Sequence, residues 1–457
     1  MSPPSVLLIS YHFYPSNEIG ARRPTALARF LVEQGLRVTV VSAFGDQNVA
    51  PGSEVLSGIT AVQIRRPART FIGTLVSLKR RLQRARSGRS VRGPSDQEPA
   101  SAPVPATSLL SRMREYYFRL AYFIDDYKRW GLRARRAAIQ AGRRHPPSLV
   151  LSSSPPLSVL WVGTLVARRL GVPHIIDLRD PWSDVVADLH PAWVLELILQ
   201  RWLERWMMHT AAAITSTTVK VIDLLTGRQP ALSSKTFVIR NGYDGAVHST
   251  GRDTGGRLSI FFAGNLYLNR DPFPLLDALE RLLSRPDVDA SRVTLTLMGR
   301  RTDQAEKSLT EWLRGKRCAQ VVTLAPPQSA EVVAEMTAQS TVLLNLAQRQ
   351  PMSVPAKTFE HLASGRENLL LCEDDSETAL LVDPIPGVTH VDPRNAAALD
   401  HVLLDLYDRH VNQGQLRAPA ERDVSAFSRD AANRAFWSVL EAVVSTGTRG
   451  VVKERPC

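Results

Sequence analysis

Short apolar runs alternate with helical patterns along most of the 457-residue chain. In the first half, the runs that read as strands are residues 6–10, 38–43, 59–65, 149–153, 174–178, 212–216 and 236–240. In the second half they are residues 259–263, 293–298, 321–325, 342–346, 368–372 and 389–391. Because these runs are continuously apolar and not alternating, they predict parallel sheets that helices cover on both faces.

Apolar residues at helical spacing fill several of the intervals between these strands. The first predicted helix spans about 21–34, carries Leu27 and Leu31 on one face and ends at Gly35. Further helices are expected at 272–283, 305–314, 329–339 and 357–363. Two such series predict an α/β chain of two Rossmann-like, doubly wound domains, with ligands in a cleft at the carboxyl ends of the strands.

The expected domain limits follow from this pattern. Residues 1–245 form the first predicted domain and 256–425 the second, and a final helix at 426–447 is expected to pack back on the first. The first domain carries a basic insertion at 66–145. Its residues 84–107, rich in Arg, Ser, Pro and Gly, predict disorder, and residues 108–141 predict a basic, aromatic, amphipathic helix.

Composition narrows the class of protein. Apolar residues make up 44% of the chain, which suits a globular protein. Cys318, Cys372 and Cys457 lie far apart without metal-ligand spacing, which suggests a reducing compartment. The sequence shows neither a cleavable apolar leader nor about 20 uninterrupted apolar residues. A cytoplasmic protein that does not span the membrane is therefore expected.

The net charge of +13 is concentrated in one segment. Residues 65–144 contain 20 Lys/Arg and 5 Asp/Glu, a local surplus that exceeds the charge of the whole chain. One interpretation is docking on the anionic inner face of the cell membrane, where each Lys/Arg contributes about 1 kcal/mol. Another is a solvated basic face over a small core. A third is nucleic-acid binding.

Two loops that follow predicted strands in the first half carry candidate site residues. One lies between a buried strand and a helix start, where backbone amides attract anions and a glycine lets a ligand approach. The other places charges and a tryptophan directly after the strand 174–178. The alternative interpretations are a plain turn and a structural ion pair that caps the next helix. The candidates are Asn17, Gly20, Arg22, Arg179, Asp180 and Trp182.

Two loops in the second half form a similar pair. One follows the strand 259–263, and its arginine is suited to neutralising a diphosphate. The other opens the helix at 357–363, where the helix N-terminus and a lysine would face an anion. The alternatives are a solvated arginine and a surface helix with an i,i+3 Lys–Glu pair. The candidates are Gly264, Asn265, Arg270, Ser353, Val354, Lys357 and Glu360.

Taken in order, these motifs resemble those of the retaining glycosyltransferases of family 4, which have the GT-B fold. They are most similar to the bacterial branch that builds capsule, exopolysaccharide and O-antigen. The resemblance covers nearly the whole chain. The segments that carry it are residues 11–23, 152–156, 177–182, 203–206, 241–244, 264–266 and 357–365.

The resemblance implies roles for the second-half candidates. Glu360 matches the second acid of the family's Glu-x7-Glu element and would hold the ribose, whereas Met352 stands at the first acidic position. Ser353 and Val354 would present amides to the donor diphosphate. Arg270 takes the place of the basic residue that pairs with phosphate.

In the first half, the resemblance places Gly20 beneath the donor phosphates. Arg179 or Asp180 occupies the place where many members have a histidine near the transferred sugar. The acceptor side is assigned to Asn17, Arg22 and Trp182.

The implied activity is sugar transfer from a nucleotide-sugar donor to a glycan or polyprenyl-linked acceptor, with retention of configuration. It needs no cofactor, no metal and no side-chain base, because the enzyme chiefly positions two substrates and neutralises the leaving diphosphate. A non-hydrolysing nucleotide-sugar epimerase of the same fold and a catalytically inactive sugar-binding relative are the alternatives from the same fold. A basic nucleic-acid-binding protein is the alternative that is not an enzyme.

Overall fold

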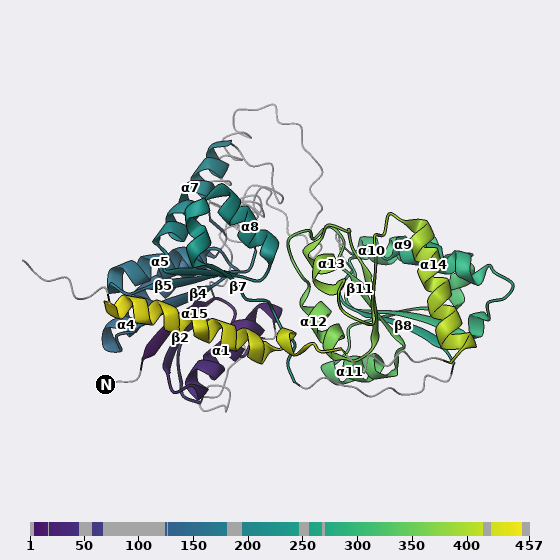
Figure 1. Cartoon of the computed structure of the whole chain (residues 1–457), viewed down its shortest axis with the longest axis horizontal. Coiled ribbons are helices and arrows are strands. Elements are labelled where there is room, and N and C mark those ends of the chain that lie inside the picture. The colour runs from purple at the N-terminus through teal and green to yellow at the C-terminus, as the bar shows by residue number, and fades with distance from the viewer. Residues whose placement is uncertain are drawn as a thin grey trace, which may run out of the picture. The chain divides into compact units, whose positions relative to one another are not determined.

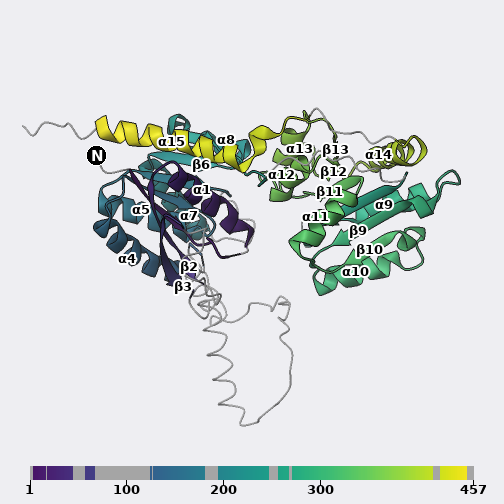
Figure 2. The same cartoon turned by 90° about the horizontal axis from the view of Figure 1, so that it is seen from below.

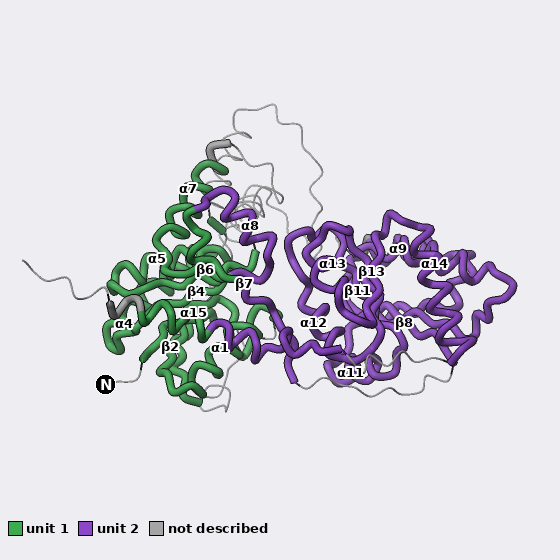
Figure 3. Tube along the Cα trace, viewed as in Figure 1, with its two compact units in different colours: residues 1–215, 231–237, 437–457 green, residues 216–230, 238–436 purple. Residues whose placement is uncertain are grey.

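The computed structural model describes residues 4–16, 18–44, 57–66, 124–125, 127–180, 194–245, 256–266, 270–414 and 422–449. By their contacts, residues 1–215, 231–237 and 437–457 form unit 1, and residues 216–230 and 238–436 form unit 2 (Figure 3). The domain limits expected from the sequence stay a prediction. The expected disordered segment 84–107 and helical residues 108–123 lie outside the described residues.

Unit 1 is built on a seven-stranded sheet in the order β3-β2-β1-β4-β5-β6-β7 (Figure 1). The central strand β1 pairs in parallel with both β2 and β4, so Leu8 lies opposite Val40 and Leu151. The loops after β1 and β4 therefore flank the point where the strand order reverses, which is where ligands bind in such sheets. The strands are β1 (Ser5–Ser10), β2 (Arg37–Phe44), β3 (Ile59–Arg65), β4 (Leu149–Ser153), β5 (His174–Leu178), β6 (Ala213–Ser216) and β7 (Thr236–Val238).

Helices cover both faces of this sheet, which explains why β4 and β5 are buried at every position. Figure 2 shows α4 and α5 on one side of β2 and β3, and α1 on the other. Gly35 ends α1 and Gly171 ends α5, each with a positive φ, at 82° and 70°, which glycine adopts without steric cost. The helices of unit 1 are α1 (Ile19–Glu33), α4 (Lys128–Arg144), α5 (Ser158–Leu170) and α7 (Val194–Thr210), with most of the 3-10 turn η2 (Pro230–Lys235) and the C-terminal part of α15 (Arg429–Arg449). Helix α8 (Val219–Arg228) belongs to unit 2.

Unit 2 repeats the topology with a six-stranded sheet in the order β10-β9-β8-β11-β12-β13. Here β8 pairs in parallel with β9 and β11, so the strand order reverses between β8 and β11. The loops after these two strands therefore lie at the same edge of the sheet. The strands are β8 (Leu258–Ala263), β9 (Val293–Met298), β10 (Val322–Ala325), β11 (Val342–Leu346), β12 (Glu367–Leu371) and β13 (Val388–Val391).

Successive residues of β8 enter different cores, as the alternation of side chains along a strand requires. Ile260 and Phe262 join the cluster that contains residues of α9, α10 and α14, whereas Phe261 packs with Met298 and Leu343 on the other face. The helices are α9 (Phe273–Leu283), α10 (Asp303–Leu313), α11 (Ala330–Gln339), α12 (Ala356–Ala363), α13 (Glu377–Val382) and α14 (Ala396–Tyr407). Short turns are η3 (Ala290–Arg292), η4 (Arg317–Gln320), η5 (Asp408–Asn412) and η6 (Ser425–Phe427).

The predicted elements agree closely with the observed ones. The strands expected at 59–65, 149–153, 174–178, 293–298 and 342–346 have the observed bounds, and the others differ by one or two residues at one or both ends. The expectation of two doubly wound, parallel α/β sheets is confirmed. None of the described helices is long and apolar enough to cross a bilayer.

Candidate active site

In unit 1, the loop after β1 meets the residues after β5. The Arg179 side chain donates a hydrogen bond through Nη1 to the Gly20 carbonyl (3.3 Å) and another through Nε to the Ser154 carbonyl. A Cβ on Gly20 would lie 3.2 Å from the His12 ring, so the backbone packs closely here. The structure thus brings together two of the predicted residues, Gly20 and Arg179, which are far apart in the sequence.

Beneath this contact lies a buried charge network centred on Asp177. Arg23 donates to both carboxylate oxygens (3.2 and 3.0 Å), and the Ser153 and Thr215 hydroxyls donate at 2.7 and 2.9 Å. Burial alone would raise the pKa of Asp177, but Arg23, Arg179 and these hydrogen bonds outweigh it and lower that pKa. Asp177 is therefore an ionised structural anchor that holds α1 to β4, β5 and β6.

The other predicted residues of unit 1 have different surroundings. Asp180 is half-buried, and burial raises its pKa although the charge of Arg179 lowers it. Arg22 is exposed in the first turn of α1. Asn17 and Trp182 lie outside the described residues, so their predicted role in acceptor binding stays a prediction.

His12 is a candidate that sequence reasoning did not single out. Its Nδ1 lies 2.7 Å from Oε2 of Glu18, and Oε1 of Glu18 lies 3.4 Å from Nη1 of Arg66. Burial lowers the pKa of His12; Glu18 raises it, and Arg66 and Arg179 lower it further. His12 follows β1 by two residues, and this position at a strand's carboxyl end was the available signal.

In unit 2, the loop after β8 packs against the end of β9. Gly299 has a φ of +147°, and a Cβ there would lie 2.0 Å from the Gly264 carbonyl oxygen. The two backbone segments therefore lie too close together for a side chain at Gly299. The Asn265 carbonyl accepts a hydrogen bond from Nη1 of Arg270 at 3.2 Å. The predicted residues of this loop therefore form one compact group, and Gly299 is a further member that the sequence did not reveal.

The loop between β11 and α12 lies beside this group. The Gln348 side chain donates to the Asp271 carbonyl (2.7 Å), which ties this loop to the one after β8. Phe359 is buried against the Phe427 ring, 6.0 Å away between centroids, and fixes which face of α12 is hidden. Lys357 is half-buried and Glu360 exposed.

The first turn of α12 has the properties of an anion site. Its buried side is held by Thr358, whose hydroxyl accepts a hydrogen bond from Asn345 on β11 at 2.9 Å. Its N-terminus follows Ser353 and Val354, where helix amides and the helix dipole favour negative charge. Burial and then the charge of Lys357 lower the pKa of His361 to about 3, so this histidine is neutral near pH 7.

Comparison with solved structures identifies the fold. The chain is similar to the HepE protein of Anabaena in complex with UDP (12% identity, TM-score 0.58, 96% of this chain and 100% of that one). It is also similar to an α,α-trehalose 6-phosphate synthase of Burkholderia multivorans (13%, 0.65, 100% of both chains) and to WaaG, a glycosyltransferase involved in lipopolysaccharide biosynthesis (14%, 0.54, 94% and 98%). At these identities the likeness establishes the GT-B fold.

The sequence itself gives a more specific match over part of its length. Residues 20–242 match the family model of the glycosyl transferase 4-like domain. No curated protein matches the chain. The domain match and the GT-B fold together support a glycosyltransferase.

Proposed function

We propose that the protein transfers a sugar from a nucleotide-sugar donor to a glycan or lipid-linked glycan, with retention of configuration, in surface-polysaccharide biosynthesis. The observation that carries this proposal is the start of α12, where Ser353, Val354 and Lys357 lie at an anion-attracting helix N-terminus. HepE, which has the same fold, has also been solved with UDP-glucose. WaaG supports the assignment to polysaccharide biosynthesis.

In this proposal the protein binds and neutralises the charged diphosphate, and no protein side chain reacts with the sugar. The amides of Ser353 and Val354, with Lys357 and Arg270, bind the donor diphosphate, and Glu360 accepts hydrogen bonds from the ribose hydroxyls. A bond forms between the acceptor oxygen and the anomeric carbon as the bond from that carbon to the diphosphate breaks. The acceptor proton passes to a departing phosphate oxygen. Fixed positive charge stabilises the developing anion.

Residues of unit 1 are assigned to the sugar and the acceptor. The proposal assigns Gly20 to the donor phosphates as well, and Arg179 and Asp180 to the transferred sugar. Asn17, Arg22 and Trp182 are proposed to bind the acceptor. No cofactor or metal is required in this scheme, since the chain's own cations neutralise the leaving group.

The donor-side assignment is tested by two substitutions. Glu360→Ala and Arg270→Ala are each expected to lower turnover at least tenfold, because each removes a proposed contact to the nucleotide. The matched controls are Glu311→Ala and Arg314→Ala, which change exposed residues at the end of α10 and should leave turnover unchanged. Rates near those of the wild type in both test variants would refute the assignment. A thermal-shift panel of UDP-, GDP-, dTDP- and CMP-sugars identifies the donor, because a bound ligand raises apparent stability.

We also propose peripheral contact with an anionic membrane through residues 65–144. Of this segment the structure describes α4, which buries Trp130 and Ala134 and exposes a row of arginines at helical spacing. Leu132 is exposed in the same helix. This combination of exposed cations and apolar side chains suits an interfacial helix. The exposed arginines are Arg129, Arg133, Arg136, Arg143 and Arg144.

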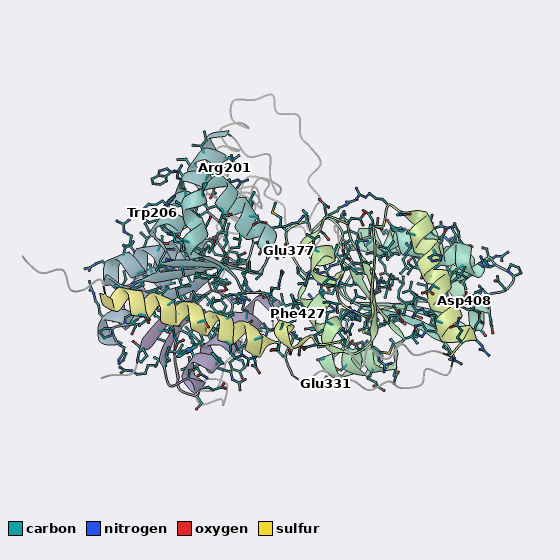
Figure 4. All side chains as sticks on the ribbon, in the orientation of Figure 1. Arg201, Trp206, Glu331, Glu377, Asp408 and Phe427 are labelled. Atoms are coloured by element: carbon teal, nitrogen blue, oxygen red, sulfur yellow. The ribbon has the colours of Figure 1, made fainter. Side chains whose placement is uncertain are left out.

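The neighbouring helix α7, which packs on α5 as α4 does, has a similar surface. Trp202 is 64% exposed and Ile198 56%, and Arg201 is exposed beside them. The Arg168 guanidinium stacks 5.4 Å from the centre of the Trp206 ring. Arg201 and Trp206 can be followed on α7 in Figure 4.

Vesicle flotation tests this contact. The full chain is expected to float with vesicles that contain phosphatidylglycerol, and less as salt is raised, because screening weakens the attraction. Replacing Arg129, Arg133 and Arg136 by serine should reduce flotation several-fold. Replacing Arg285, Arg292 and Arg314, exposed arginines of unit 2, should not. A chain that never floats at moderate salt would contradict the proposal.

A further inference from the structure

Three successive peptide groups between β11 and α12 are fixed through their carbonyl oxygens. The carbonyls of residues 351–353 accept hydrogen bonds from the Glu377 amide (2.9 Å), the Thr218 hydroxyl (2.8 Å) and the Thr378 hydroxyl (3.2 Å), in that order. Thr218 directly precedes α8, Glu377 and Thr378 begin α13, and all three belong to unit 2. The orientation of this loop is therefore set from outside the loop.

Fixing a carbonyl also fixes the next amide. The peptide group is planar, and in the trans form the N–H of a residue points opposite to the preceding carbonyl. The two peptides that join residues 352–354 are trans. Holding the carbonyls of Met352 and Ser353 therefore directs the amides of Ser353 and Val354 away from α8 and α13. The Ser353 amide has a long bond to the Gln350 carbonyl (3.4 Å), and the Val354 amide has no partner among the described residues.

One buried carboxylate, that of Glu377, links the starts of α8 and α13, which carry the donors to this loop. Glu377 is 3% exposed and begins α13 (Figure 4). Its oxygens accept hydrogen bonds from the amides of Val219 (3.0 Å) and Lys220 (3.1 Å) in the first turn of α8, and from Nη1 of Arg240 (2.9 Å). A negative charge at a helix N-terminus is stabilising. Glu377 thus joins α8 to α13 and sets the spacing between their two threonines.

We propose that Thr218, Glu377 and Thr378 are positioning residues that orient the Ser353 and Val354 amides toward the donor diphosphate. The inference rests on the proposed function, since it assigns those amides to the diphosphate. None of the three side chains needs to touch the nucleotide. Their effect is expected on the diphosphate and not on the ribose, which the proposed function assigns to Glu360.

The test compares ligands that differ only in phosphates. Isothermal titration measures Kd for UDP, GDP and dTDP, and the tightest binder is then compared with its own nucleoside. Thr218→Val and Thr378→Val each remove one neutral hydrogen bond and are expected to weaken diphosphate binding about two- to tenfold. Glu377→Gln removes the charge that joins the two helices and is expected to weaken it tenfold or more. Nucleoside binding should change less than twofold in all three.

A matched control separates positioning from general stability. Thr341→Val removes a hydroxyl that donates to the Ser259 carbonyl (2.9 Å) and accepts from the Ser259 amide (2.8 Å), and Thr341 is about as buried as the test residues. It precedes β11, whereas the diphosphate loop follows that strand. This variant is expected to lower the melting temperature without changing the ratio of diphosphate to nucleoside affinity.

The outcomes distinguish this inference from the proposed function. If the wild type binds a diphosphate and the threonine variants bind it equally well, the inference fails and the proposed function stands. Equal losses for diphosphate and nucleoside also overturn it, because they indicate a general structural defect. If the wild type binds none of the three diphosphates, the proposed function fails and this inference with it.

Discussion

The carboxyl edges of the two sheets have the same topology but use their polar side chains differently. In unit 1, the central contact joins two side chains: Arg23 and Asp177 form a buried ion pair, and beside it Arg179 donates to the Gly20 carbonyl. In unit 2, the carbonyls of residues 351–353 each accept a hydrogen bond, two from threonine hydroxyls and one from the Glu377 amide. An ion pair fixes side chains and packs helices, whereas a held carbonyl fixes the direction of an amide. The same arrangement of strands thus supports an anchored charge network in one unit and a row of oriented amides in the other.

The largest effect is expected from breaking the buried ion pair of unit 1. Asp177→Ala leaves Arg23 buried without its carboxylate and should destabilise unit 1 by about 3–5 kcal/mol, the usual cost of removing one partner of a buried pair. Denaturant unfolding of the full chain measures this loss. Asp400→Ala removes the exposed pair of Arg281 and Asp400 and should have little effect, because solvent screens surface pairs. Equal losses in both variants would show that the buried network is not special.

Alanine substitutions at two glycines, Gly299 and Gly20, are expected to lower stability by different, intermediate amounts. Gly299→Ala places a Cβ 2.0 Å from the Gly264 carbonyl oxygen at a φ of +147°, so the backbone must shift at a cost of about 1–3 kcal/mol. Gly20→Ala meets two side chains that can shift, the His12 ring at 3.2 Å and Nη2 of Arg179 at 3.5 Å, and should cost less than about 1 kcal/mol. Melting temperatures of the two variants check the order. A larger loss for Gly20→Ala would mean that the edge of unit 1 is the more tightly packed.

The smallest expected effect is a change in acid stability. Because the folded-state pKa of Asp177 is depressed, its ionised form stabilises unit 1 fully above its ordinary pKa of 3.8, and that stabilisation is lost as pH falls through the folded-state pKa. Asp177→Asn should therefore flatten the loss of stability below about pH 4.

Asp180 gives the opposite control. Its pKa is raised by burial, so its ionised form destabilises the folded state as pH increases, and Asp180→Asn should steepen the fall in stability toward low pH. Unfolding midpoints between pH 2 and pH 7 distinguish the two variants. If the unfolding midpoints of the two variants depend on pH in the same way, the assignment of Asp177 as the ionised anchor is contradicted.

The sequence located the edges of the sheets but not their chemistry. The apolar runs predicted the bounds of β3, β4, β5, β9 and β11 to the residue, because a strand that helices cover on both faces needs apolar side chains on both. The same pattern placed Gly20, Arg179, Arg270 and the start of α12 at strand ends. His12 and Gly299 stand at equivalent positions and were missed, because their place after a strand was the only signal and the residue types alone do not indicate a site.

Glu377 shows why the remaining contacts could not be predicted. In the sequence it follows Ser376, whose hydroxyl accepts from the Ala379 amide and caps α13, so Glu377 is expected to be an ordinary acid in a first helical turn. Its partners Val219 and Arg240 lie more than 130 residues earlier. Only the tertiary structure brings the start of α8 and Arg240 within hydrogen-bonding distance of Glu377.

By itself, the sequence determined two doubly wound parallel sheets and the loops at their carboxyl edges, because the period of apolar side chains is a local property of the chain. Only the tertiary structure decided which polar groups within those loops bind each other. Arg23 reaches Asp177 across 154 residues because the strand order places β5 two strands from β1, and such neighbours depend on topology. The amide directions at Ser353 and Val354 were decided in the same way, by donors from distant helices.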